Sequence, residues 1–406
     1  MEYDDSDIQE SYPEKFVCSE CFDDDHLRAF IEGAVTSRRC SYCCRESPKR
    51  KIAAPIDGVI EHILAAISSR YGEAWASGSS WDSEDGRYVN NTQDTDELLQ
   101  EYVRLPNDDS GELYQDIFGA FPQWDWSSRE PWSATDAQIL QWGWNQFVKT
   151  VKYRRRFFFQ RLEEVEHDRE DLDPSSMLYE FGRRCSNNGL IVNLPKGTEI
   201  LRCRPRAVRT ERFTKARELG PPPNRLAKQN RMSPAGIPMF YGSDDKKTTL
   251  AEMPDPPKFY AIGRFTTLRS LNILDLTNVR TPSIFDITDG SDYDWALFMS
   301  QFLKDFSGPI ERDDRIHIDY VPTQVVTEYL RDARLDGVRV EGIKYCSARN
   351  KGGVCFVLFI DAHDVEPNAG DLSAIQVENE PWRNRNADYT LRLAKITHHS
   401  RGRRKS

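Results

Sequence analysis

Apolar side chains divide the chain into a helical part and a part of mixed period. Between residues 51 and 190 they recur mostly at helical spacing. The clearest case follows Pro55, at Ile56, Val59, Ile60, Ile63, Leu64 and Ile67. Residues 94–105 and 110–121 show the same pattern, and a longer helix is predicted from a Thr135 or Asp136 cap to about residue 167. We therefore expect a helical domain over residues 51–190.

Tryptophan is concentrated in this helical part. Seven of the nine tryptophans lie between Trp75 and Trp144. Large aromatic side chains contribute most of the buried apolar area in many cores. The composition therefore predicts an aromatic core for this domain.

The pattern changes at about residue 191, where short apolar runs are bounded by glycine and proline. Strands are predicted over residues 259–265, 270–276, 337–343 and 352–360, and helices over residues 292–306 and 323–337. These elements predict a mixed α+β domain over residues 191–370. The remaining segment, 371–406, is polar and ends in a basic stretch, so we expect a disordered tail there.

The composition indicates which class of protein this is. The chain has 406 residues, a net charge of −10 and 38% hydrophobic residues, as in a globular protein of two or three domains. The acidic balance argues against attraction of the whole protein to nucleic acid or to an anionic membrane. The N-terminus has no apolar segment like that of a signal peptide, and no stretch approaches the length that spans a membrane. We expect a cytoplasmic protein.

Two CxxC pairs lie in the first 50 residues, Cys18 with Cys21 and Cys40 with Cys43. Two such pairs can place four thiolates around one tetrahedral ion, and a site closed in this way is structural. The spacing predicts a zinc ion that ties residues 1–50 to the first helix. Four reduced thiols without metal, or His26 or Cys44 in place of one ligand, remain the alternatives.

A second group of polar residues lies in the mixed domain. Arg202 and Arg204 alternate on a predicted strand and so share one face. Arg231 precedes the turn SPAG, and Tyr241 follows it. Further along, Glu252 ends a helical stretch and Ser347 follows a strand. Taken singly, each has an ordinary structural explanation, such as a surface arginine or a core aromatic.

The order of these residues resembles the RES domain, a family named for its arginine, glutamate and serine. The resemblance runs from about Leu194 to Asp361. It rests on three sequence blocks in family order: RMSPAG…FYGS…TLAE, VPTQ…EYLR…DGVR and YCSA…GGVCFVLF. The preceding zinc-binding and helical regions resemble the HEPN/RES extension found ahead of some RES domains.

The resemblance implies an ADP-ribosyltransferase-like fold and a toxin that degrades NAD by cleaving its nicotinamide–ribose bond, as a glycohydrolase or phosphorylase. The family's functional residues correspond here to Arg202, Arg231, Tyr241, Glu252 and Ser347, with Arg204 in a direct or supporting role. Two positions depart from the family pattern: Leu201 replaces an aromatic residue, and Ser233 replaces an asparagine. Transfer of ADP-ribose to a protein, or NAD binding without turnover, stays open. So does the binding of an antitoxin, a regulatory protein or a second copy of the chain.

The residue types suit this chemistry. Arginine binds pyrophosphate oxygens, and an aromatic face can stack on nicotinamide or ribose. A carboxylate stabilises the positive charge that develops on the ribose, and a serine can hold a ribose hydroxyl or the carboxamide. A Rossmann or P-loop sequence is absent.

A weaker signal lies in the charged stretch around Arg161 and His167. Ribonucleases of the HEPN class use a closely spaced arginine and histidine on one helix, but the spacing here fits only loosely. We interpret this stretch as a solvated helix face, and RNA cleavage is a minor alternative.

Overall fold

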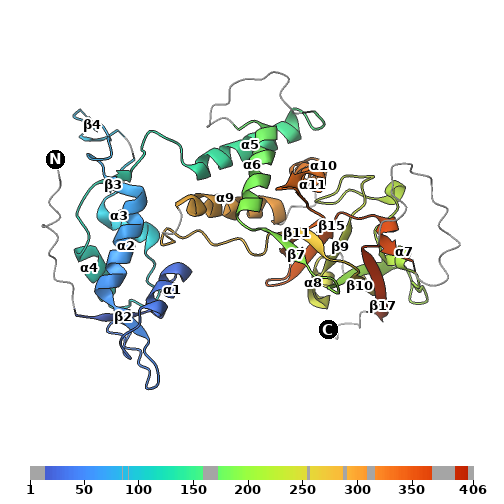
Figure 1. The fold of residues 1–406 in the computed structure, drawn as a ribbon, viewed down its shortest axis with the longest axis horizontal. Coiled ribbons are helices and arrows are strands. Elements are labelled where there is room, and N and C mark those ends of the chain that lie inside the picture. The colour runs from blue at the N-terminus through green and yellow to red at the C-terminus, as the bar shows by residue number, and fades with distance from the viewer. Residues whose placement is uncertain are drawn as a thin grey trace. The chain divides into compact units, whose positions relative to one another are not determined.

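The structure is a computed structural model that describes residues 14–84, 86–89, 91–158, 172–253, 257–286, 290–308, 316–367 and 389–400. The chain forms two compact units. The first comprises Met1–Gln138 and Thr281–Phe298, and the second comprises Ile139–Arg280 and Met299–Ser406. Figure 1 shows the helices of the first part of the chain, α1 to α4, in blue and cyan, and the sheet of the second unit in green to red.

The first unit is built on helix α2, which begins directly after Pro55 as predicted. Its buried positions include Val59, Ile60, Ile63 and Ile67, which belong to one core cluster. Helix α3 begins with a capping box between Asp94 and Glu97. The elements are β1 (Phe16–Cys18), η2 (Ser19–Cys21), α1 (Asp25–Gly33), β2 (Ala53–Pro55), α2 (Ile56–Arg70), α3 (Thr95–Tyr102) and α4 (Glu112–Gly119).

An aromatic core was predicted from seven tryptophans, and for most of these seven residues the expected burial is wrong. Only Trp126 and Trp144 are buried among them. The exposed ones are Trp75, Trp81, Trp124, Trp132 and Trp142. Most of these lie on short strands and turns, where the helical period does not decide which way a side chain points. The short strands pair as β3 (Tyr71–Glu73) with β6 (Trp126–Ser128), and β4 (Trp81–Asp82) with β5 (Arg87–Tyr88).

The second unit contains one nine-stranded mixed sheet, in the order β16-β17-β10-β8-β9-β15-β14-β11-β7. Neighbours are antiparallel except in the pairs β11–β14 and β16–β17. The predicted mixed α+β class is confirmed for this part of the chain. The strands are β7 (Ile191–Leu194), β8 (Glu199–Arg206), β9 (Phe240–Ser243), β10 (Phe259–Thr267), β11 (Leu271–Asp275), β14 (Gly342–Cys346), β15 (Val354–Leu358), β16 (Val365–Glu366) and β17 (Leu391–Ser400).

The second unit also contains helices. Two of these helices are divided between the two units. The shared helices are α5 (Asp136–Tyr153) and α9 (Gly290–Ser307). The others are α6 (Pro174–Asn187), α7 (Ala216–Leu219), α8 (Lys246–Ala251), α10 (Ile316–Asp319) and α11 (Val321–Asp332). Of the helices that lie in the described ranges, none has the length and apolar character needed to cross a membrane.

Strand β17 corrects the prediction of a disordered tail. Its residues pair with β10 along most of the length of both strands, and Figure 1 shows the two side by side. Arg206 also holds it, because the buried guanidinium donates to the carbonyl oxygen of His399 at 2.9 Å. The strand was missed because its residues are largely polar and basic, which gives little hydrophobic alternation.

Two predicted helices end earlier in the structure than the sequence pattern indicated. The helix expected over residues 323–337 ends at Asp332 and is followed by a small hairpin of β12 (Arg334–Leu335) and β13 (Val338–Arg339). The helix stops where Ala333 takes an extended backbone conformation, and Asp336 and Gly337 form the turn of the hairpin with positive φ. The long helix predicted to residue 167 is α5, which ends at Tyr153. Arg161 and His167 lie outside the described residues.

Candidate active site and cysteine cluster

The arginines of β8 lie on one face of the strand, and each has a different environment. Arg202 places its guanidinium carbon 5.2 Å from the centre of the Phe240 ring. Its Nη1 is buried and, within the described part of the chain, has no hydrogen-bond partner. Burial, with a contribution from the charge of Arg204, lowers the pKa of Arg202 to about 9. Arg204 donates to the carbonyl oxygen of Gly220 at 3.4 Å. Arg202 is therefore a half-buried cation with one buried donor that is not used within the described part of the chain.

Arg231 is held by the end of α9 and by α11. Its guanidinium donates to the carbonyl oxygens of Phe306, at 3.1 Å, and Gly308, at 2.5 Å. Its own carbonyl accepts from Thr323 Oγ1 at 2.5 Å, and Gln324 Nε2 donates to the carbonyls of Asn230 and Ser233, at 2.8 and 3.3 Å. The sequence block VPTQ therefore fixes the loop that carries Arg231.

Tyr241 points from β9 toward the same loop. Its hydroxyl and Ser233 Oγ are 2.9 Å apart. Burial raises the pKa of Tyr241 to about 12. Ser233, which departs from the family pattern, is thus a direct partner of the tyrosine.

Glu252 and Ser347 form a hydrogen-bonded pair. Ser347 Oγ donates to Glu252 Oε1 at 2.6 Å. The same Oγ accepts from the backbone N–H groups of Arg349, at 3.2 Å, and Asn350, at 3.1 Å. Glu252 is the residue directly after α8. The turn after β14 therefore orients the serine, and the serine orients the carboxylate.

These residues come together around a residue that sequence reasoning missed, Tyr345 on β14. Burial raises its pKa well above the usual range, and Glu252, Tyr241 and Arg231 all lie close enough to act on it electrostatically. Arg202 is in turn close enough to Tyr241 for its charge to lower the pKa of the tyrosine, against the effect of burial. Tyr345 stands two residues before Ser347, so alternation along a strand was the sequence signal that could have found it.

Two family models match the chain. One family model, the HEPN/RES N-terminal domain 1, matches residues 34–165, and another, the RES domain, matches residues 202–383. The chain is a RES domain protein with a HEPN/RES-type N-terminal region. No curated protein and no solved structure matches it. The six predicted residues, from Arg202 to Ser347, all lie inside the RES match.

Gly353 of the RES domain lies where α8 meets the β14–β15 connection. A Cβ at this position would lie 2.1 Å from Thr248 Oγ1 and 2.7 Å from Asn350 Nδ2. Asn350 Nδ2 donates to Thr248 Oγ1 at 2.8 Å, so the added atom would break the bond that joins the helix to the turn. We expect Gly353→Ala to destabilise the domain by about 1–3 kcal/mol and to separate Glu252 from Ser347. Denaturant unfolding measures the first effect. Gly236→Ala is not a suitable control because its φ is positive, whereas Gly58→Ala meets no atom within 4 Å.

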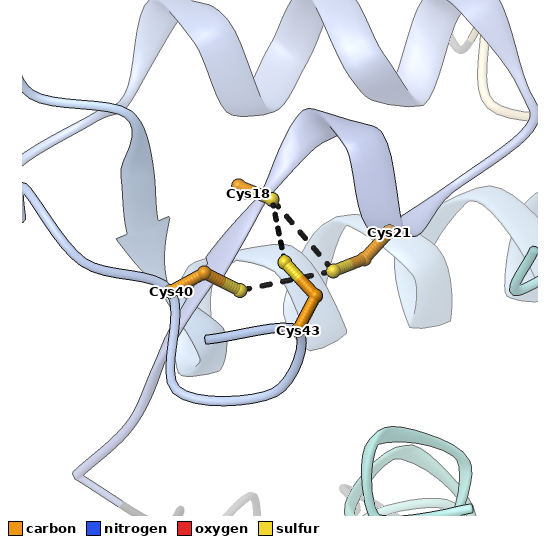
Figure 2. Close-up of side chains that lie close together, drawn as sticks. All are labelled: Cys18, Cys21, Cys40 and Cys43. Carbon is orange, nitrogen blue, oxygen red and sulfur yellow. Dashed lines mark hydrogen bonds between the residues drawn. The ribbon is translucent and has the colours of Figure 1, made fainter. Parts of the chain in front are cut away.

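The four predicted cysteines lie in the first unit and point toward one another (Figure 2). The Sγ atoms are 3.7 Å apart for Cys18 and Cys21, 3.5 Å for Cys18 and Cys43, and 3.7 Å for Cys21 and Cys40. All four lie within 4.8 Å of one another. Four ligands about 2.3 Å from a tetrahedral zinc ion would be separated by about 3.8 Å. The donor set and spacing therefore fit a metal such as zinc.

The alternative ligands lie outside this cluster. Cys44 is exposed and has a positive φ of 59°. His26 Nδ1 is 3.6 Å from a carboxylate oxygen of Asp286. The HEPN/RES match begins at residue 34, between the two CxxC pairs. The first CxxC pair, which lies on β1 and η2, is therefore outside the matched region.

Proposed function

We propose that this RES domain cleaves the nicotinamide–ribose bond of NAD, as a glycohydrolase or phosphorylase, and that the chain acts as a toxin or defence effector. The observation that supports this most is Arg202 Nη1, close to Tyr241, which is buried and finds no hydrogen-bond partner among the described residues. In the same cluster, the Glu252 carboxylate is held by Ser347. Such a donor suits an anionic ligand, and such a carboxylate suits a developing cation. We extend the proposal to an ADP-ribosyltransferase-like fold for the domain.

In this proposal Arg202 binds the pyrophosphate, with Arg204 beside it. Arg231 already donates to two backbone carbonyls, so its part is to hold the loop and to supply positive charge near Glu252. Tyr241 presents its ring to the nicotinamide or the ribose. The substrate is therefore oriented by groups that the fold fixes in advance.

In the reaction the bond between the ribose carbon and the nicotinamide nitrogen breaks, and its electron pair leaves with nicotinamide. The ribose becomes an oxocarbenium-like cation, which Glu252 stabilises. Water or phosphate then forms the new bond to that carbon, giving ADP-ribose or its phosphate. With water, one proton is released.

The acceptor distinguishes the proposal from its nearest alternative, transfer of ADP-ribose to a protein. The test uses NAD labelled in its adenylate phosphate, incubated with the full chain in buffer, in buffer with phosphate and in cell lysate. We expect label in ADP-ribose or ADP-ribose phosphate. Label on protein would favour the transferase, and label that binds but stays in NAD would favour a sensor.

Arg202→Met gives a second test of the site. Because the folded state lowers the pKa of Arg202, the charge opposes folding at any pH below about 9. Removing it should leave the melting temperature of the free protein unchanged or higher. It should also weaken binding of ADP-ribose by about tenfold or more. Thermal unfolding with and without ADP-ribose measures both. A control is Arg264→Met, which removes an exposed partner of Glu199. Equal ligand stabilisation in wild type and Arg202→Met would contradict the assignment.

We also propose a structural zinc ion, held by Cys18, Cys21, Cys40 and Cys43. Four buried or half-buried sulfur ligands leave no open position for chemistry. A reducing compartment such as the cytoplasm would keep these thiols free and would supply NAD. Because loss of NAD would harm the cell that makes the enzyme, an antitoxin, a regulatory protein or the N-terminal region would have to restrain it.

A further inference from the structure

Three exposed tryptophans form a surface on the first unit. Trp75, Trp81 and Trp132 are exposed over 68%, 56% and 65% of their area. We call these three residues the tryptophan surface. Single exposed apolar side chains are ordinary, but several large ones in one place indicate an interaction site.

Hydrogen bonds join Trp132 to the turn that carries Trp75, and Trp81 follows this turn in the chain. Trp132 Nε1 donates to the carbonyl of Gly78 at 3.4 Å, and the N–H of Gly78 donates to the carbonyl of Trp75 at 3.3 Å. The same turn is fixed to β6, because Ser79 Oγ donates to Ser127 Oγ at 3.1 Å. Trp81 begins β4 two residues further on, with its ring 5.0 Å from that of Tyr88. The rings are therefore presented by one connected set of turns and short strands.

The region that carries this surface is strongly acidic. Residues 71–133 contain fourteen aspartates and glutamates and three arginines, and no lysine or histidine. That excess of negative charge is larger than the net charge of −10 for the whole chain. A polyanion such as RNA or an anionic membrane would be repelled, whereas a cationic partner would be attracted. Two copies joined by this surface would also repel each other, because both faces carry the same charge.

A cavity of about 260 Å³ lies in the same acidic region, between the start of α3 and the segment that leads into β6. Its lining includes Trp124, Asp94, Asp96 and Asp125. The carbonyl of Asp125 accepts from the N–H of Ala74, the residue before Trp75, at 2.7 Å, which joins the cavity to the same turn. An aromatic face with carboxylates around it is a favourable environment for a guanidinium group.

We propose that the tryptophan surface and this cavity bind an arginine-rich segment of a partner protein. Guanidinium groups stack on the exposed indole rings, and one enters the acidic cavity. Arginine suits the site better than lysine because its planar group stacks on aromatic rings and forms paired hydrogen bonds with carboxylates. This interaction is independent of the NAD chemistry proposed for the RES domain.

The test uses the full chain and a fluorescent twelve-residue peptide of alternating arginine and serine, with binding followed by fluorescence polarisation. We expect binding to the wild type that weakens as salt is raised. Replacing Trp75 and Trp132 together with alanine should weaken it by about tenfold or more. The matched control is Trp142→Ala, since Trp142 is 51% exposed and lies outside the acidic region. It should change the affinity by less than about twofold.

A second variant tests the effect of charge on binding without removing any aromatic ring. Glu84→Lys with Glu130→Lys alters two exposed residues near Trp81 and Trp132 and leaves every ring in place. It should also weaken peptide binding by about tenfold or more. The proposal is wrong if the wild type does not bind the peptide, or if Trp142→Ala weakens binding as much as the surface variants. It is also wrong if polyuridylate binds the wild type but not the tryptophan variant. Self-association that the tryptophan variant abolishes would assign the surface to a second copy.

Discussion

Replacing Glu252 with glutamine is expected to lower the rate of nicotinamide release from NAD by about a hundredfold or more. Glutamine keeps the size of the side chain and can still accept from Ser347 Oγ, which lies 2.6 Å from Glu252 Oε1. It removes the negative charge that would stabilise the ribose cation. The loss should therefore appear in kcat, with little change in KM. Steady-state assays that follow free nicotinamide measure both.

The control for this variant is Glu199→Gln. Glu199 is exposed at the start of β8 and pairs with Arg264 at 3.0 Å. Its replacement should leave kcat within about twofold of the wild type. If Glu252→Gln were as active as the wild type while Glu199→Gln also kept its activity, Glu252 would have no part in the chemistry.

Replacing Cys21 with serine is expected to remove the bound metal and to unfold the segment around it. Cys21 is fully buried, and its Sγ is 3.7 Å from both Cys18 and Cys40. A structural zinc ion contributes about 10–16 kcal/mol of binding free energy to folding, so losing one ligand should abolish most of that stabilisation. Metal analysis should give about one zinc ion per chain for the wild type and close to none for the variant. Thermal unfolding should show an earlier transition.

The matched control is Cys44→Ser, one residue from the cluster. Cys44 is exposed and lies outside the group of four. Its variant should keep the zinc and the stability of the wild type. Full zinc content in Cys21→Ser would contradict the assignment of Cys21 as a ligand, and loss of zinc in Cys44→Ser would contradict the choice of ligands.

The sequence predicted those elements in which one period extends over enough residues. Helix α2 was predicted because its isoleucines and valine repeat at helical spacing over four turns, and these positions are buried. Strands β10, β11 and β15 were predicted from short apolar runs between glycines and prolines. Tryptophan content did not predict burial, because rings on turns can face solvent. Strand β17 was missed because its position does not depend on apolar alternation. It is held by its pairing with β10 and by the hydrogen bond from Arg206 to the carbonyl oxygen of His399.

The residues of the candidate site could be predicted from the sequence. Their burial and their hydrogen bonds could not. Alternation on β8 placed Arg202 and Arg204 on one face. It did not show that Arg202 would have one buried nitrogen without a described partner, while Arg204 donates to the carbonyl of Gly220. The bond between Ser347 and Glu252 joins residues 95 positions apart in the chain, so no local pattern could show it. Tyr345 was overlooked because a tyrosine on a strand is common in any sheet.

The most direct test of the central proposal is nicotinamide formation by the purified full chain, with NAD as the only substrate and with phosphate present or absent. We expect free nicotinamide in the wild-type reaction, together with ADP-ribose or, when phosphate is supplied, ADP-ribose phosphate. Unchanged NAD in both buffers, in a preparation shown to bind NAD and to be free of any bound inhibitor, would contradict it. The RES domain would then be a binding module rather than an NAD-degrading enzyme.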